Sequence, residues 1–202
     1  MPPLHAVRAR AKTIARDLRG DHAVLIARAL TVARDGDEQL AFELFRAAPK
    51  AAAAMTRRQV ESLLPVLHDW CSTDCFGCFV SGVAWREGAL TDKYILAWTR
   101  SKALWTRRAA LVSTVPLNLN ARGSKAPKGD AVRTLAICER LVDDHEDMIV
   151  KALSWALRTL APKDPAAVRA FLVRHEARLA ARVLRETRNK LTTGLKNPKG
   201  RR

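Results

Sequence analysis

Helical periodicity runs through almost the whole chain and restricts the fold more than any other feature of the sequence. In the segment 57–67, for example, Val60, Leu63, Leu64 and Leu67 recur at the i, i+3, i+4, i+7 spacing of one buried helix face. No segment has the pattern of a β-strand, and nine Gly and nine Pro are too few for a β-sandwich with many tight turns. The sequence therefore predicts an all-α protein.

Residues that start and stop helices divide this pattern into ten or more helices joined by short turns. Asp21, Thr56 and Ser101 stand where an N-cap is expected, and Pro165 stands where a first helical residue is expected. The expected helices cover residues 4–20, 21–34, 38–48, 57–67, 72–85, 90–99, 102–115, 130–142 and 144–160, one that begins at 165, and 176–191.

Short helices in close succession indicate antiparallel helix pairs stacked in chain order, which is the pattern of an α-solenoid. No strict repeat of about 40 residues is visible. We expect a single curved domain over residues 1–192 with a concave face, followed by a basic, disordered tail at 193–202. A compact orthogonal helix bundle is the alternative.

The formal net charge of +16 indicates what kind of partner the chain binds. A field of this sign attracts polyanions, either nucleic acid or an anionic membrane surface. The segment 169–202 holds eleven Lys and Arg against two acids, and the loop expected at 118–129 is also basic. The sequence has no run of about 18 apolar residues and no secretory signal, so we expect no membrane span and a cytoplasmic, nucleoid-associated protein.

Two of the five tryptophans have charged neighbours that set them apart. Trp70 lies four residues before Asp74, and Trp155 lies one turn before Arg158. An aromatic face beside a carboxylate is suited to a cationic or deoxyribose-like group. Core positions at helical spacing are the alternative, and they are the expected role of the other three, Trp85, Trp98 and Trp105.

From spacing alone Asp74 has two interpretations. It follows Ser72, so it fits a capping acid in the first turn of a helix. It also fits a single carboxylate on a basic surface, where it would stabilise positive charge on a sugar during glycosidic cleavage and align a water molecule. The spacing does not decide between them.

Arg107 and Arg108 stand together on an otherwise apolar helix. Because adjacent residues on a helix do not share a face, we expect at least one of the two guanidinium groups to face solvent or a phosphate.

Cys71, Cys75 and Cys78 follow the C-x3-C-x2-C spacing of radical-SAM iron–sulfur sites. That chemistry needs a β/α barrel and a Gly-rich cofactor segment, and this sequence predicts neither. The same spacing lines small apolar residues along one helix face, which is the ordinary role of buried cysteine. A zinc site with Cys138 or His68 as fourth ligand has no better support. We therefore expect reduced, intracellular cysteines and neither a metal nor a cofactor.

Three segments taken together resemble a known family. They are Trp70-x-x-x-Asp74, the run SKALWTRRAA at 101–110, and the run KALSWALR at 151–158. Their order, residue types and separations resemble those of the bacterial DNA alkylation repair glycosylases built from HEAT-like helical repeats (AlkD-type). The resemblance spans roughly residues 35–192.

The resemblance implies an α-solenoid of HEAT-like antiparallel helix pairs that holds duplex DNA in a basic concave groove. It implies hydrolysis of the N-glycosidic bond of cationic alkylated purines, such as 3-methyladenine and 7-methylguanine, without full base flipping. By position, Trp70 and Trp155 correspond to tryptophans that line the sugar, Asp74 to the carboxylate that stabilises it, and Arg108 to an arginine that supports the backbone beside the lesion.

The sequence departs from the family pattern at two places. Cys71 stands where the family often has a second acid, and the segment that precedes the first repeats in relatives is not recognisable. A non-catalytic module for distorted or branched DNA and a scaffold for an acidic protein therefore stay as alternatives. We expect a monomer whose partner is alkylated duplex DNA, bound by Arg107, Lys151, Arg158, Arg182, Arg185, Arg188 and Lys190.

Overall fold

The computed structural model describes residues 3–18, 20–119 and 129–198. Every regular element in these residues is a helix, so the predicted all-α class is confirmed. Most of the basic loop expected at 118–129 and the end of the expected tail lie outside the described residues.

The elements are α1 (Leu4–Asp17), α2 (His22–Arg34), α3 (Glu38–Ala47), α4 (Pro49–Ala53), α5 (Arg57–Glu61), η1 (Leu64–Val66), α6 (Trp70–Phe76), the π-helical turn η2 (Gly77–Ser81), α7 (Gly82–Arg86), α8 (Asp92–Trp98), α9 (Leu104–Val112), α10 (Val115–Asn118), α11 (Ala131–Arg140), α12 (Asp147–Leu160), α13 (Pro165–Arg174) and α14 (Ala181–Thr193).

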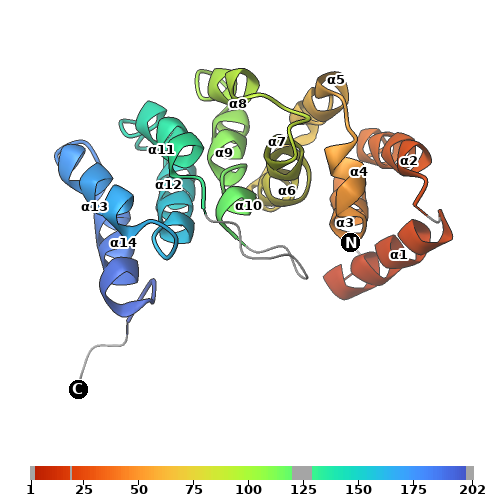
Figure 1. Ribbon diagram of the computed structural model, residues 1–202. Helices are drawn as coiled ribbons and strands as arrows, with labels where there is room; N and C mark the ends of the chain where they lie inside the picture. Colours follow the sequence, from red (N-terminus) through yellow and green to blue (C-terminus); the bar gives the residue numbers. More distant parts are fainter. Residues whose placement is uncertain (1–2, 19, 120–128, 199–202) are drawn as a thin grey trace.

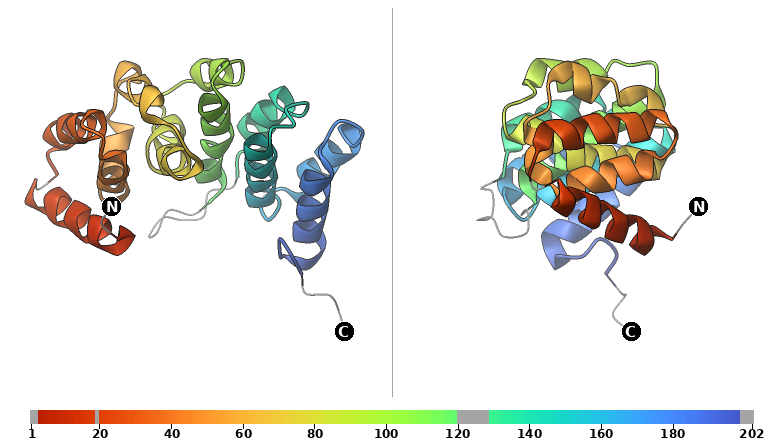
Figure 2. Two further views of the ribbon diagram at one scale, coloured as in Figure 1. Left: turned by 180° about the vertical axis from the view of Figure 1, so that it is seen from behind. Right: turned by 90° about the vertical axis from the view of Figure 1, so that its right-hand side faces the viewer.

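The helices pack in two rows that follow the chain (Figure 1). In one row α3, α6, α9, α12 and α14 each contact the next, and α1 packs against α3 at the N-terminal end. The other row holds α2, α5, α8, α11 and α13. The rows form an arc with the α3-to-α14 row on its inner side, and Figure 2 shows the same arc from behind. The helices thus form a single domain, and their assignment to HEAT-like repeats stays a prediction.

Several helices start where the sequence predicts, because short polar side chains satisfy their first N–H groups. Asp21 accepts a hydrogen bond from the N–H of Val24 at 3.0 Å. Thr56 and Gln59 form a reciprocal capping box at the start of α5. Pro165 is the first residue of α13, where its missing N–H costs nothing.

Several helices are shorter than predicted, and two of them lose a whole turn or more at one end. The helix expected over 57–67 ends at Glu61, because Pro65 has no N–H to donate and its ring crowds the carbonyl four residues before it. The last helix, expected from residue 176, begins at Ala181 because residues 175–178 form a turn. None of the described helices is long and apolar enough to cross a membrane.

The start of α9 also differs from the prediction. Ser101 does not cap the helix, since its hydroxyl accepts the N–H of Ala103 at 3.2 Å and the helix begins only at Leu104. The two arginines that follow therefore lie in the first and second turns of α9, close to the helices on either side.

Glycine lets the α6–η2–α7 segment approach α9 very closely. A Cβ atom added at Gly77 would lie 2.6 Å from Cγ1 of Val112, and one added at Gly82 would lie 2.6 Å from the carbonyl oxygen of Ser113. Only residues without a side chain fit at these points. The close approach brings side chains of α6 and α9 within reach of each other.

The apolar core extends along the whole arc and includes the tryptophans predicted to lie there. Trp85 and Trp98 are buried, as expected, and Trp105 is half-buried against the same core. Ala109 and Ala110 of α9 are fully buried in this core. The core therefore fixes the inner helices that carry the candidate site.

Candidate active site

The first helical turn of α6 tests the interpretation of Asp74 as a capping acid. The N-cap is Asp69, whose carboxylate accepts the N–H of Ser72 at 2.7 Å, while the Ser72 hydroxyl lies 3.4 Å from the N–H of Asp69. The helix therefore begins at Trp70, two residues earlier than predicted. Asp74 lies in the second turn and caps nothing, so its interpretation as a capping acid is wrong.

Asp74 is instead held by Arg108. The guanidinium donates from Nε to Oδ1 and from Nη2 to Oδ2, both at 2.9 Å, in a bidentate pair across the α6–α9 contact. The Arg108 side chain is 6% exposed and that of Asp74 is 20% exposed. Two parallel charge-assisted hydrogen bonds fix both the position and the plane of the carboxylate.

Arg108 also donates from Nη1 to the carbonyl oxygen of Met148 at the start of α12. One buried side chain thus joins α6, α9 and α12, three consecutive helices of the inner row. The family resemblance implies that this arginine supports the DNA backbone beside the lesion, and that role stays a prediction. Its guanidinium is largely occupied by protein partners.

Burial raises the pKa of the Asp74 carboxyl above its ordinary value, against the opposing effect of the hydrogen bonds and positive charge of Arg108. Burial thus removes part of the water around the carboxyl group, and Arg108 replaces that water only in part. A carboxylate accepts about four hydrogen bonds, and Arg108 uses two. The partly exposed oxygens keep acceptor capacity for a water molecule or a sugar.

Trp70 lies one helical turn before Asp74, and residues four apart share a helix face. Its side chain is unusual for a tryptophan because it is 57% exposed. The exposed ring is a surface available for stacking on the same helix face as the fixed carboxylate, and its contact with a sugar stays a prediction.

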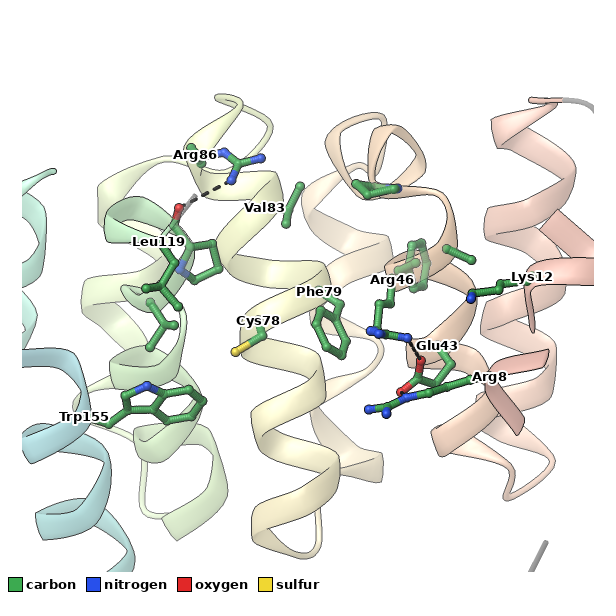
Figure 3. Close-up of a pocket in the computed structure, with 15 residues that line it drawn as sticks. Arg8, Lys12, Glu43, Arg46, Cys78, Phe79, Val83, Arg86, Leu119 and Trp155 are labelled. Carbon is green, nitrogen blue, oxygen red and sulfur yellow. Dashed lines mark hydrogen bonds and ion pairs between the residues drawn. The ribbon is translucent and has the colours of Figure 1, made fainter. Parts of the chain in front are cut away.

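Trp155 lines a cavity of about 580 Å³ on the inner side of the arc (Figure 3). Cys78 and Phe79 of η2 lie between Trp155 and the opposite wall in this view. Cys78 follows Asp74 by one turn. Burial raises the pKa of the Cys78 thiol, and the nearby negative charge of Asp74 raises it further. Trp155 and Cys78 thus line the same cavity, whereas Trp70 and Asp74 are not among the residues that line it.

The other wall of the cavity is basic and was not predicted from the sequence. It is formed by α1 and α3, which contribute Arg8, Lys12 and Arg46 around the buried Glu43. Arg8 and Lys12 stand four residues apart, so a shared face on the first helix was readable from their spacing. Nothing local in the sequence connects them to Arg46.

The predicted DNA-binding cations fall into two groups. Arg107 and Arg158 are half-buried: Arg107 donates to Asp144 at 2.7 Å, and Arg158 donates to Ser154 at 3.1 Å. Both neighbouring arginines of α9 therefore turn toward protein partners and neither faces solvent freely, while a phosphate contact, the other outcome expected for this pair, stays a prediction. The other five lie on the surface of α12 and α14: Lys151, Arg182, Arg185, Arg188 and Lys190.

Acidic neighbours neutralise part of this surface. Asp147 pairs with both Lys151 and Arg182, at 2.7 and 2.8 Å, and the hydrogen bond from Lys151 lowers the pKa of the Asp147 carboxyl. Arg188 pairs with Glu176 at 2.6 Å. These exposed pairs are weak, so DNA phosphates can replace the carboxylates at small cost.

The cysteines of α6 have the properties of packed thiols. Cys71 donates to the side-chain oxygen of Gln39 at 3.5 Å, and the amide nitrogen of Gln39 lies 3.7 Å from the sulfur of Cys75. Burial raises the pKa of Cys75 to about 12, so its thiol stays protonated. No three His, Cys, Asp or Glu side chains in the described part of the chain form a group that could hold a metal ion.

The fold and the site together define an α-helical protein with a cavity that has one basic wall, and with a fixed carboxylate one turn before Cys78, which lines that cavity. Residues 3–191 match the sequence model of the DNA alkylation repair enzyme family. The chain belongs to this family, which confirms the resemblance to DNA alkylation repair proteins and supports a role in the repair of alkylated DNA. Comparison with curated proteins and with solved structures gave no match.

Proposed function

We propose that this protein is a DNA glycosylase that hydrolyses the N-glycosidic bond of cationic alkylated purines, such as 3-methyladenine and 7-methylguanine, in duplex DNA. The observation that carries the proposal is the Asp74 carboxylate, which buried Arg108 fixes one turn beyond the exposed ring of Trp70. The net charge of +16 provides the attraction to DNA.

The chemistry needs little beyond this arrangement. An alkylated purine with a positive charge is already a good leaving group, so its departure from C1′ requires no general acid. As the C1′–N bond breaks, the sugar becomes positively charged, and a preorganised carboxylate stabilises this charge. A water molecule aligned by Asp74 then bonds to C1′ and releases its proton, leaving an abasic site and a neutral base.

The two tryptophans contribute the faces of their indole rings to binding of the sugar. The electron-rich face of an indole attracts a cationic sugar, and it also excludes water from the side that it covers. We assign this role to Trp70 and Trp155, with the lesion left in the stack and without full base flipping. Arg108 acts through Asp74 as a positioning residue, because its side chain is only 6% exposed.

Asp74→Asn tests the proposal. It keeps the size of the side chain and removes the charge that the transition state requires, so base release from a duplex with a single 7-methylguanine should fall by 10²-fold or more, on the order found for loss of one preorganised electrostatic group. Asp69→Asn is the matched control, because asparagine also caps helices and the same charge is lost from the same helix. Equal loss of release in both variants, or loss of DNA binding by Asp74→Asn, would contradict the assignment.

A second candidate function is recognition of distorted or branched DNA without catalysis. Cys71 favours it, because this position carries a thiol bound to Gln39 where the family often has an acid. Preference for junction DNA, together with no base release from alkylated duplex, would support this alternative over the glycosylase.

A further inference from the structure

The basic wall of the cavity is organised by a buried carboxylate. Glu43 lies on α3 with its side chain 1% exposed, in the apolar interior beneath α1. Its Oε1 accepts from Nε of Arg8 at 3.1 Å, and its Oε2 accepts from Nη1 of Arg46 at 3.0 Å. Both oxygens of one carboxylate therefore hold a guanidinium group each, one from α1 and one from α3.

This arrangement exceeds what a structural ion pair needs. A single arginine neutralises a buried glutamate. Here two arginines contact Glu43, and Lys12, one turn after Arg8 on α1, lines the same cavity. Three positive charges against one negative charge leave a local excess of two. The arginine side chains keep 41% and 36% of their surface exposed, and they line the cavity with Lys12.

The donors that Glu43 does not use are available to an anion in the cavity. A guanidinium has five N–H donors, and among the described residues each of these two arginines uses one of them on Glu43. Arg46 also lies over the ring of Phe79, with Cζ 5.9 Å from the ring centroid, which restricts its orientation further. Two oriented guanidinium groups and an ammonium group match the oxygens of a phosphodiester.

We propose that Arg8, Arg46 and Lys12 form a phosphate clamp that binds one backbone phosphate of the DNA, with Glu43 as the positioning residue that orients the two arginines. The proposal rests on the proposed function, because it takes duplex DNA as the ligand of the cavity whose far wall holds Trp155 (Figure 3). The clamp extends the DNA site from α6, α9 and α12 to α1, so the first helix takes part in substrate binding.

Arg8→Gln and Arg46→Gln test the clamp through the salt dependence of binding to an unmodified duplex. Each phosphate contact contributes a slope of about −0.9 in log Kobs against log salt, so loss of one contact should reduce the affinity change between 50 and 200 mM salt by about 3.5-fold. Arg16→Gln is the matched control, since it removes the same charge from the same helix at a 76% exposed position outside the cavity. Equal slopes in all three variants would overturn the proposal.

A scan with methylphosphonate linkages locates the phosphate. Neutralising one linkage at a time should weaken binding by the wild-type protein at one position in particular, and Arg46→Gln should lose this sensitivity there alone. If the sensitivity is unchanged in Arg46→Gln, the clamp is refuted. Inorganic phosphate is the second probe: if it binds with the same arginine dependence while the DNA slope stays unchanged, the cavity is a site for free anions and not for DNA.

Glu43→Gln separates the orientation of the two arginines by Glu43 from the effect of its negative charge on DNA binding. Removing a negative charge from a DNA-binding surface should strengthen binding if orientation is irrelevant, whereas the clamp predicts weaker binding and loss of the methylphosphonate effect. The arginine variants keep the test decisive if Glu43→Gln does not fold. Binding to unmodified DNA does not depend on base release, so the two proposals fail separately. A protein that never releases a base can still have the clamp, and an active glycosylase can lack it.

Discussion

The contact between Gly77 and Val112 provides a direct test of how the fold holds the candidate site. Gly77→Ala adds one methyl group where α6 continues into η2. The backbone at Gly77 is helical, with φ −61° and ψ −43°, so alanine adopts it without strain. Apart from the higher helix propensity of alanine, any effect must therefore come from the space around the new Cβ.

The magnitude follows from two distances. The added Cβ would lie 2.6 Å from Cγ1 of Val112, and ordinary contact begins at 3.4 Å, so the helices must separate by about 0.8 Å. The same shift would stretch the 2.9 Å hydrogen bonds between Asp74 and Arg108 to about 3.7 Å, beyond hydrogen-bonding range. Overpacking costs about 1 to 3 kcal/mol and the helix propensity of alanine returns about 1, so we expect a net loss of about 0 to 2 kcal/mol.

Urea unfolding measures the stability, and single-turnover base release from methylated duplex measures the site. We expect release to fall by up to about 10²-fold, because a displacement near 1 Å is enough for such a loss. Gly77→Ala combined with Val112→Ala should recover part of the activity, since the second change removes the methyl groups that the new Cβ meets. Wild-type stability and release in Gly77→Ala would refute this explanation of the packing.

Three other predictions concern the site itself. Arg108→Lys should cost about 1.5 to 3 kcal/mol in urea unfolding, the value of one hydrogen bond to a charged group, because an ammonium cannot replace the bidentate pair with Asp74; an unchanged midpoint would contradict it. Trp70→Ala should change stability by less than about 0.5 kcal/mol, because the ring is largely exposed, yet slow base release; normal release would exclude Trp70 from the site. The rate of release should decrease as the pH falls through the raised pKa of Asp74, so the acidic limb of a pH–rate profile, corrected for spontaneous loss, should lie above 3.8; a limb at or below that value would contradict the role of the buried carboxyl.

Local signals in the sequence predicted much of the fold. Helical periodicity and the absence of strand patterns gave the all-α class, and Asp21, Thr56 and Pro165 marked helix starts correctly. The predictions failed where two local signals competed. Asp69 and Ser72 are both good capping residues, and the structure uses them together in one capping box, which moves the helix start to Trp70.

The site depended on contacts between distant parts of the chain. The partners of Arg107 and Arg108 are Asp144 and Asp74, which lie 37 and 34 residues away, so no pattern within α9 could show that both arginines turn inward. The basic wall of the cavity was missed for the same reason, because Arg8 meets Glu43 only after α1 has packed on α3. Periodicity identifies the face of a helix, whereas tertiary packing decides what that face meets.

The central claim is that the protein breaks a glycosidic bond, and mass spectrometry of the bases released from methylated duplex DNA tests it most directly. We predict free 3-methyladenine and 7-methylguanine above the level lost without protein, in equal number to the abasic sites formed, and no such release by Asp74→Asn. Tight binding to the same DNA with no free base above background would contradict the claim and would favour a protein that recognises DNA structure without catalysis.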